Sequence, residues 1–163
     1  MEGRVIELHS RSRVNDFLAA YHYLGPVPAW KAAFGLTAGK SDLEFVGIIV
    51  IGLPVSRVLM QEGYLEIRRM CLHNAPKNAG SMLLGYATRW AVNHGYAKVV
   101  SYADPSVTGP GNCPGNKHRG TVYLAANFRP AGETRPDNWA RNGRERRVRY
   151  TGSKLRFIWE APA

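Results

Sequence analysis

The sequence predicts a mixed α/β fold in which helices pack against a central sheet. Apolar residues recur at helical spacing in separate segments, and short apolar runs with strand character stand between them and after them. Along the chain these segments follow the order helix, three strands, helix, strand, helix, further strands. That order is typical of one mixed sheet with helices packed on it.

The size and composition suit a single domain. The chain has 163 residues, and 45% of them are hydrophobic, which is enough for a substantial core and argues against disorder. No apolar run approaches the roughly 18 residues of a membrane span, and the first residues lack the apolar stretch of a signal peptide. Two cysteines, Cys71 and Cys113, make no disulfide framework, and Cys71 is expected to be a buried strand residue. We therefore expect one domain over residues 1–163, in the cytoplasm and without a membrane partner.

The first half of the chain predicts one helix and two strands. Apolar residues at positions i, i+3, i+4 and i+7 indicate an amphipathic helix: Val14, Phe17, Leu18 and Tyr21. This helix is expected to end before the break at Gly25 and Pro26. Strands are predicted over 31–37 and 43–51, and the nearly continuous apolar run at 45–51 indicates a central strand.

The middle of the chain predicts a strand, a helix and a second strand. Residues 64–72 read as a strand in which Leu65, Ile67 and, as an open alternative, Arg69 alternate with Glu66 and Arg68. A loop over 74–80 leads into a helix over 81–94, with Gly95 as its C-cap, and a strand follows over 97–103. After a loop over 104–117 that holds three glycines and three prolines, a short helix is expected over 119–127.

The C-terminal part of the chain is strongly basic. Strands are expected at 129–134, 144–150 and 155–159, which we interpret as a basic β extension over about residues 129–160. Nine basic residues stand against three acidic ones between positions 129 and 156, within a net charge of +10. Trp139 and Tyr150 are interleaved with the arginines, a pattern typical of nucleic-acid surfaces, although an acidic nucleotide cofactor would account for part of it. The residues expected to contact nucleic acid are Arg135, Arg141, Arg144, Arg146, Arg147 and Arg149.

Asp104 is the first candidate for a catalytic group. It directly follows the apolar strand predicted over 97–103, and open sheets bind their ligands at the carboxyl ends of strands. The alternative is a turn aspartate before Pro105, which is a common pair.

Two segments carry a resemblance to a known fold family. The loop Asn74-Ala75-Pro76-Lys77-Asn78-Ala79-Gly80 runs into a helix from Ser81, and the segment TVYLAANF ends in a bend at Asn127-Phe128. Over roughly residues 31–135 this pattern resembles the GNAT acyltransferases. The resemblance implies a mostly antiparallel central sheet flanked by helices. It also implies that the loop and the helix start hold the donor, through Arg69, Asn78, Gly80 and Ser81, and that Tyr123 takes the place of a general acid.

A narrower set of residues resembles the Mom family of phage DNA-modification proteins. The set comprises Tyr21-His22-Tyr23-Leu24, Arg69, Asn78, Ser81, SYAD at 101–104, His118-x-Gly120 and Tyr123-x-x-Ala126-Asn127-Phe128. The resemblance implies transfer of a carbamoylmethyl group to the exocyclic amino group of adenine in DNA, which protects phage DNA from restriction in the infected bacterial cell. An eleven-residue insert, 107–117, separates Asp104 from His118.

The resemblance assigns roles to the candidate residues. An adenine amino group needs an acceptor for its proton, and we expect Asp104 to supply it. Tyr23 and His22 are expected beside the base or the leaving group, and His118 beside phosphate or as a proton shuttle. Ser81 is expected to contact an anion or a carbonyl oxygen, or alternatively to act only as an N-cap.

The donor and a metal remain open at the level of sequence. The sequence does not identify the donor: an acyl-CoA, an aminoacyl-type donor such as a glycyl-tRNA and a donor of another class are all open. Because only Gly80 remains of the usual glycine-rich loop, a donor other than acetyl-CoA is favoured. No metal motif is present and no metal ligands are assigned; the alternative is an iron site in which His22, Asp104 and His118 would supply two histidines and one carboxylate. The alternatives are an acetyl-CoA-dependent N-acetyltransferase and a non-catalytic nucleic-acid-binding protein on the same fold.

Overall fold

One sheet organises the described part of the chain. The computed structural model describes residues 3–22, 24–39, 41–105, 119–135 and 153–163. Within these ranges seven strands lie in the order β1-β2-β3-β4-β5-β7-β6. The strands are β1 (Val5–Glu7), β2 (Ala32–Thr37), β3 (Phe45–Gly52), β4 (Tyr64–Leu72), β5 (Lys98–Ala103), β6 (Arg129–Glu133) and β7 (Leu155–Glu160). The helices are α1 (Arg11–Tyr21), α2 (Arg57–Gln61), α3 (Ala79–Asn93) and α4 (Thr121–Ala125).

The pairing is antiparallel at every step except between β4 and β5, which run parallel. β7 lies between β5 and β6, so the last strand of the chain is built into the sheet. The predicted fold class, a mostly antiparallel sheet flanked by helices, is confirmed. Among the described residues of the C-terminal part, β6 and β7 belong to this sheet. The strand predicted at 144–150 lies outside the described residues.

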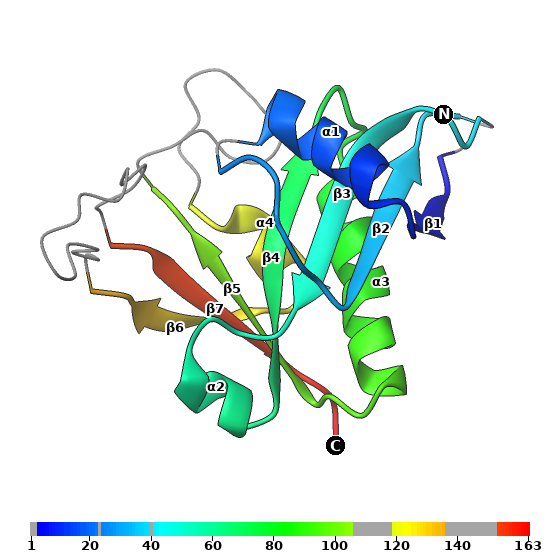
Figure 1. Cartoon of the computed structure of the whole chain (residues 1–163). Helices are drawn as coiled ribbons and strands as arrows, with labels where there is room; N and C mark the ends of the chain where they lie inside the picture. Colours follow the sequence, from blue (N-terminus) through cyan, green and yellow to red (C-terminus); the bar gives the residue numbers. More distant parts are fainter. Residues whose placement is uncertain (1–2, 23, 40, 106–118, 136–152) are drawn as a thin grey trace, which may run out of the picture.

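The helices cover both faces of the sheet, as Figure 1 shows: α1 and α2 lie on one face, and α3 and α4 lie on the other. The larger core lies under α3, whose Leu83 and Leu84 are fully buried against β4 residues such as Leu65. A second core lies under α1, where Val14 and Leu18 pack on Ile48. Truncating a leucine such as Leu83 to alanine is expected to cost about 2–5 kcal/mol, because it removes buried methyl groups and leaves a cavity.

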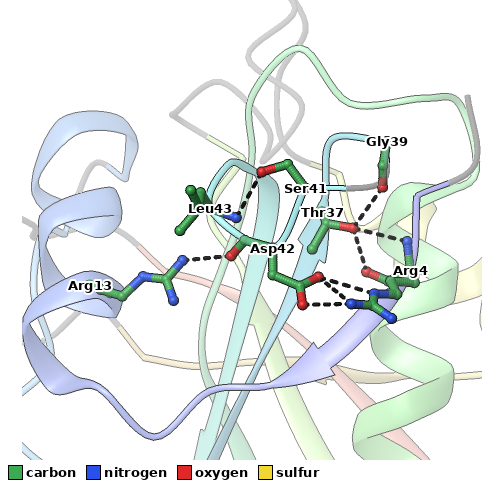
Figure 2. Close-up of polar contacts among 7 residues, drawn as sticks. All are labelled: Arg4, Arg13, Thr37, Gly39, Ser41, Asp42 and Leu43. Atoms are coloured by element: carbon green, nitrogen blue, oxygen red, sulfur yellow. Dashed lines mark hydrogen bonds and ion pairs between the residues drawn. The ribbon is translucent and has the colours of Figure 1, made fainter.

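Polar contacts tie the N-terminal strand to the turn between β2 and β3, as Figure 2 shows. The Arg4 guanidinium donates to both carboxylate oxygens of Asp42, and the Arg4 backbone N–H donates to the Thr37 hydroxyl at 3.1 Å. From α1, Arg13 donates to the Asp42 backbone oxygen at 2.8 Å. The ion pair is exposed, so it contributes little by itself, but the set fixes where β1 and α1 join the sheet.

Most predicted elements are found close to their expected bounds. The helix expected over 81–94 begins two residues earlier, and Gly95 follows it with a φ of +85°, as a residue after a helix end requires. The helix expected over 119–127 is only α4, because Asn127 has a φ of +66° and turns the chain into β6. The short elements β1 and α2 were not predicted.

Candidate functional site

The central feature of the site is the separation of β4 from β5. These parallel strands pair only where Tyr64, Leu65 and Glu66 face Lys98, Val99 and Val100. β4 then continues to Leu72 and β5 to Ala103, and Figure 1 shows the two strands diverging with α4 behind them. Backbone groups along the diverging part of β4 therefore face a position that β5 does not fill. Such groups can hydrogen-bond an extended ligand, because a strand edge presents N–H and C=O groups in a row.

A β-bulge in β4 lies beside this divergence. Val50 of β3 faces Arg69, and the next residue, Ile51, faces Ile67, so Arg68 is an extra residue in β4. Because a bulge interrupts the alternation of side chains, both Arg68 and Arg69 reach the α1 side of the sheet. Their hydrogen bonds agree with this: Arg68 donates to the Leu53 oxygen at 3.0 Å, and Arg69 donates to the loop after α1. The open alternative that placed Arg69 with Leu65 and Ile67 is wrong for this reason.

Asp104 occupies the position that the sequence predicts. It directly follows β5, whose last residue is Ala103, and its side chain is fully buried. A carboxyl group is rarely buried without a structural or chemical reason, since leaving water is costly for its charged form. Its place at the carboxyl end of a diverging strand makes it the strongest candidate for a proton acceptor.

Ser101 and Tyr102 project to opposite faces of the sheet. Ser101 is buried on the α4 side next to Tyr123, whereas Tyr102 belongs to the cluster beneath α2. Burial raises the pKa of Tyr123 to about 12, and the Ser101 hydroxyl opposes that rise. Tyr123 also packs against the rings of Phe128 and Phe157, with ring centroids 5.6 and 5.3 Å apart. In this position Tyr123 stays protonated at neutral pH and can donate a hydrogen bond.

Glu66 is a candidate that sequence reasoning passed over. It stands where β4 and β5 part, is only 8% exposed, and accepts a hydrogen bond from the Val55 backbone N–H at 2.9 Å. Burial raises the pKa of its carboxyl, against smaller opposing effects from that hydrogen bond and from the nearby Arg68, Lys154 and Arg69 charges. Burial also raises the pKa of Tyr102, with Glu66 as a second cause. The available signal was a single acidic residue inside the strand predicted over 64–72, but the alternation of side chains assigned Glu66 to the polar face.

The start of α3 holds the residues expected to bind the donor. Asn78 is the N-cap residue, its side chain makes no capping hydrogen bond, and Ser81 lies within the helix, where its hydroxyl donates to the Asn78 oxygen at 3.1 Å. Ser81 is therefore not the N-cap, contrary to that alternative. Gly80 is buried, and a Cβ atom there would overlap a Val122 methyl group, so this glycine allows α3 and α4 to pack closely. Arg69 lies away from this helix start, bound to the loop after α1.

The remaining predicted residues divide between described and undescribed parts of the chain. His22 follows α1, and its Nδ1 accepts a hydrogen bond from the Leu24 backbone N–H at 3.0 Å. Arg135 is exposed just beyond β6. Outside the described residues lie Tyr23, His118, Arg141, Arg144, Arg146, Arg147 and Arg149.

Metal binding and membrane insertion can be examined only for the described residues. Among them, no three histidine, cysteine or carboxylate side chains gather as a metal site would need. His118 lies outside these ranges, so the iron set of His22, Asp104 and His118 stays a prediction. No described helix combines the length and the apolar character that crossing a bilayer demands.

Comparison with solved structures places the fold among the GNAT acetyltransferases. A phosphinothricin acetyltransferase from Sinorhizobium meliloti, solved with acetyl-CoA, matches with a TM-score of 0.65 and 10% identity, covering 99% of this chain and 89% of that one. The ribosomal-protein-S18-alanine N-acetyltransferase of Escherichia coli matches with a TM-score of 0.64 and 10% identity, covering 99% and 96%. An acetyltransferase of Bacillus subtilis, solved with CoA, matches with a TM-score of 0.63 and 14% identity, covering 99% of this chain and 100% of that one. At these identities the likeness establishes the fold.

The sequence itself gives a more specific match. No protein in a curated collection of sequences matches this chain. The Mom protein family, however, matches residues 5–156, a span that contains the whole set of residues from Tyr21 to Phe128 on which the resemblance rested and also takes in β1, the rest of α1 and the start of β7. The chain has a GNAT fold and belongs to the Mom protein family.

Proposed function

We propose that this chain is a group-transfer enzyme that modifies adenine in DNA, placing a carbamoylmethyl group on the exocyclic amino group. Membership of the Mom family supports the reaction. The structural observation that carries the proposal is Asp104, a fully buried carboxyl at the end of β5, beyond the point where β4 and β5 separate. Restriction evasion by a phage in its bacterial host is the biological role that follows.

The chemistry explains why a buried carboxylate is needed. The lone pair of the adenine N6 is delocalised into the ring, so N6 becomes nucleophilic only as its proton is removed. In the proposed step Asp104 accepts that proton while N6 forms a bond to the donor carbon and the donor's leaving group departs with the bonding electrons. Tyr123, protonated at neutral pH, is assigned to donate a hydrogen bond on the α4 side. His22 and Tyr23 are assigned to the base, on the α1 side.

The donor is proposed to bind along the diverging part of β4, with its head toward the start of α3. CoA and acetyl-CoA are the ligands named for two neighbours of the same fold. In this chain Asn78 and Ser81 lie at the start of α3. The space next to the Gly80 Cα is filled by the Val122 side chain. An acyl-CoA or an aminoacyl-type donor is compatible with these residues. Because acyl transfer forms an amide on N6, the carbamoylmethyl product requires a glycyl amide that then rearranges to its isomer, in which the CH2 carbon is bonded to N6.

DNA is the proposed acceptor because the protein carries a net charge of +10. The adenine amino group is paired in duplex DNA, so the enzyme has to extrude the base or act on open strands. The arginines between 135 and 149 are assigned to the phosphate backbone.

Nucleoside mass spectrometry tests the proposal. The chain is expressed in a bacterium, and its DNA is digested and compared with DNA from cells that make Asp104→Asn, which keeps the shape and removes the charge. We expect a nucleoside about 57 Da heavier than deoxyadenosine, the mass that CH2CONH2 adds when it replaces the N6 hydrogen, and its loss in Asp104→Asn. Asp16→Asn, a position on α1 away from β5, is the matched control and should behave as wild type. Unmodified DNA from folded protein would direct attention to an N-acetyltransferase, for which stabilisation by acetyl-CoA is the test.

A further inference from the structure

The Arg69 guanidinium is bound to backbone oxygens on the α1 side of the sheet. Its Nε donates to the Gly25 oxygen at 3.1 Å, and its Nη2 donates to the Pro26 oxygen at 3.4 Å. Its Nη1 donates to the Arg68 oxygen at 2.7 Å. A guanidinium is a planar fork with fixed donor directions, so binding two consecutive carbonyls fixes their relative orientation. The bulge at Arg68 is what directs this side chain toward the loop after α1.

The loop that Arg69 holds carries the first histidine of the candidate site. The His22 backbone N–H donates to the Leu18 oxygen at 2.9 Å, and the Gly25 N–H donates to the His22 oxygen at 2.9 Å. Gly25 has a φ of +66°, which glycine adopts without strain. Beyond the turn, the Val27 N–H donates to the Asn15 side chain at 3.1 Å, and Val27 is fully buried.

This turn also determines which nitrogen of His22 carries the proton. The Leu24 N–H donates to Nδ1, so Nδ1 has to be without a proton, and in the neutral ring the hydrogen is on Nε2. A histidine in this form offers an N–H donor at Nε2 and has no second basic nitrogen to act as a proton acceptor while the turn is intact. The conformation of the turn therefore selects the chemistry that His22 can perform.

We propose that Arg69 is a positioning residue: its guanidinium holds the turn after α1 and thereby keeps the Nδ1 of His22 on the Leu24 backbone N–H, so that the ring hydrogen is on Nε2. This inference rests on the proposed function for its effect on DNA modification, but the state of His22 can be measured without any activity. The proposal assigns Arg69 to the side of the site where adenine binds, and no longer to the side where the group donor binds. Of Asp104 and His22, Asp104 is then the residue that accepts the proton.

The test measures the imidazole nitrogens of His22 by NMR in wild type, Arg69→Met and Gly25→Ala. Arg69→Met removes the donors and keeps an unbranched side chain, whereas Gly25→Ala strains the same turn without touching the guanidinium. Arg89→Met, an exposed position on α3, is the matched control. His22→Gln identifies the His22 signals among the five histidines. We expect one fixed tautomer in wild type and in the control, and averaged nitrogen shifts in both turn variants.

Two further measurements show whether Arg69 acts where adenine binds or where the group donor binds. Stabilisation by CoA in a thermal-shift assay should be the same in Arg69→Met as in wild type, whereas adenine modification should fall about 10- to 100-fold, because a catalytic group is misplaced. Unchanged His22 signals in both turn variants would overturn the proposal, and so would loss of CoA stabilisation in Arg69→Met alone. Wild-type protein that modifies no DNA would overturn the proposed function and leave the His22 measurement valid.

Discussion

Burial raises the pKa of two side chains near the separation of β4 and β5, Glu66 and Tyr123. Asp104 and Glu66 are both carboxyl groups removed from water, and Tyr123 is a phenol removed from water. Within the described residues the backbone N–H of Val55 bonds the Glu66 carboxylate, while arginine and lysine charges act on it from further away. At the scale of single residues, the site combines Glu66 and Tyr123, which hold their protons more tightly than they would in water, with the buried carboxyl of Asp104.

Glu66 gives a pH-dependent prediction for stability. Because burial raises the pKa of its carboxyl, the folded state binds this proton more tightly than the unfolded chain does. The stability that Glu66 contributes is therefore complete below the ordinary carboxyl pKa and is lost as the pH rises through the raised value. Glu66→Gln keeps an oxygen for the Val55 N–H and cannot ionise, so its free energy of unfolding relative to wild type should increase as the pH rises above the ordinary carboxyl pKa.

Urea unfolding at a series of pH values measures this difference. Glu62→Gln, an exposed position at the end of α2, is the control and should run parallel to wild type. A Glu66→Gln curve that also runs parallel to wild type would show that the carboxyl titrates as it does in the unfolded chain.

The sequence predicted Asp104 but not Glu66, and the reason is local. Asp104 follows an apolar strand, and the end of such a strand is a recognisable place for a functional group. Glu66 sits inside a strand, where alternation assigns a charged residue to the solvent face. Its burial depends on the segment around Val55 and on the cluster beneath α2, and the sequence did not predict α2.

At the scale of elements, close packing between α3 and α4 shapes the region behind the diverging strands. Gly80 in the first turn of α3 meets Val122 of α4, and Gly120 before α4 meets the ring of Phe157. For the long elements with clear periodicity, the predicted ends lie within two residues of the observed ends. β1, with three residues, and α2, with five, are too short for periodicity to reveal, and the bulge in β4 arises from pairing with β3, which no single strand encodes.

The packing of Gly80 can be tested with a second glycine of the same helix. Gly80→Ala should destabilise the protein by about 1–3 kcal/mol, because the new methyl group has no space next to Val122. Gly85→Ala has only the end of the Arg89 side chain nearby, at 3.8 Å, and should stabilise the helix by up to about 1 kcal/mol. Chemical denaturation of both variants gives the two values.

Combining Gly80→Ala with Val122→Ala supplies the matching control. The double variant should recover part of the stability that Gly80→Ala loses, since the obstructing methyl groups are gone. Equal loss in the presence and absence of the Val122 side chain would place the cause elsewhere in the first turn of α3.

At the scale of the whole molecule, charge is the dominant property. The net charge of +10 belongs to a chain of only 163 residues, and the arginines between 141 and 149 account for a large share of it. Such a charge favours any polyanion, so it supports DNA as a partner without selecting a sequence. Sequence composition alone predicted this property, because net charge does not depend on the fold.

Salt dependence measures the contribution of the arginines. The affinity of the protein for duplex DNA should fall steeply as salt increases. Replacing Arg141, Arg144, Arg146, Arg147 and Arg149 with glutamine should make the slope shallower, by about 0.9 for each phosphate that the variant no longer neutralises. Arg89→Gln on α3 is the control and should leave the slope unchanged. A slope that the five replacements do not alter would assign phosphate binding to other basic residues.

Tandem mass spectrometry of nucleosides from cells that make the protein tests the central claim most directly. An acetyl group on N6 would add about 42 Da, whereas a glycyl group and a carbamoylmethyl group would each add about 57 Da. Alkali separates the last two, because the amide bond of a glycyl group to N6 breaks in mild alkali and the bond from N6 to the CH2 of a carbamoylmethyl group survives. We predict a heavier deoxyadenosine whose added mass of about 57 Da stays on the base fragment and resists alkali, and which is absent with Asp104→Asn. DNA in which every deoxyadenosine keeps its ordinary mass, in cells that contain the folded protein, would contradict the account.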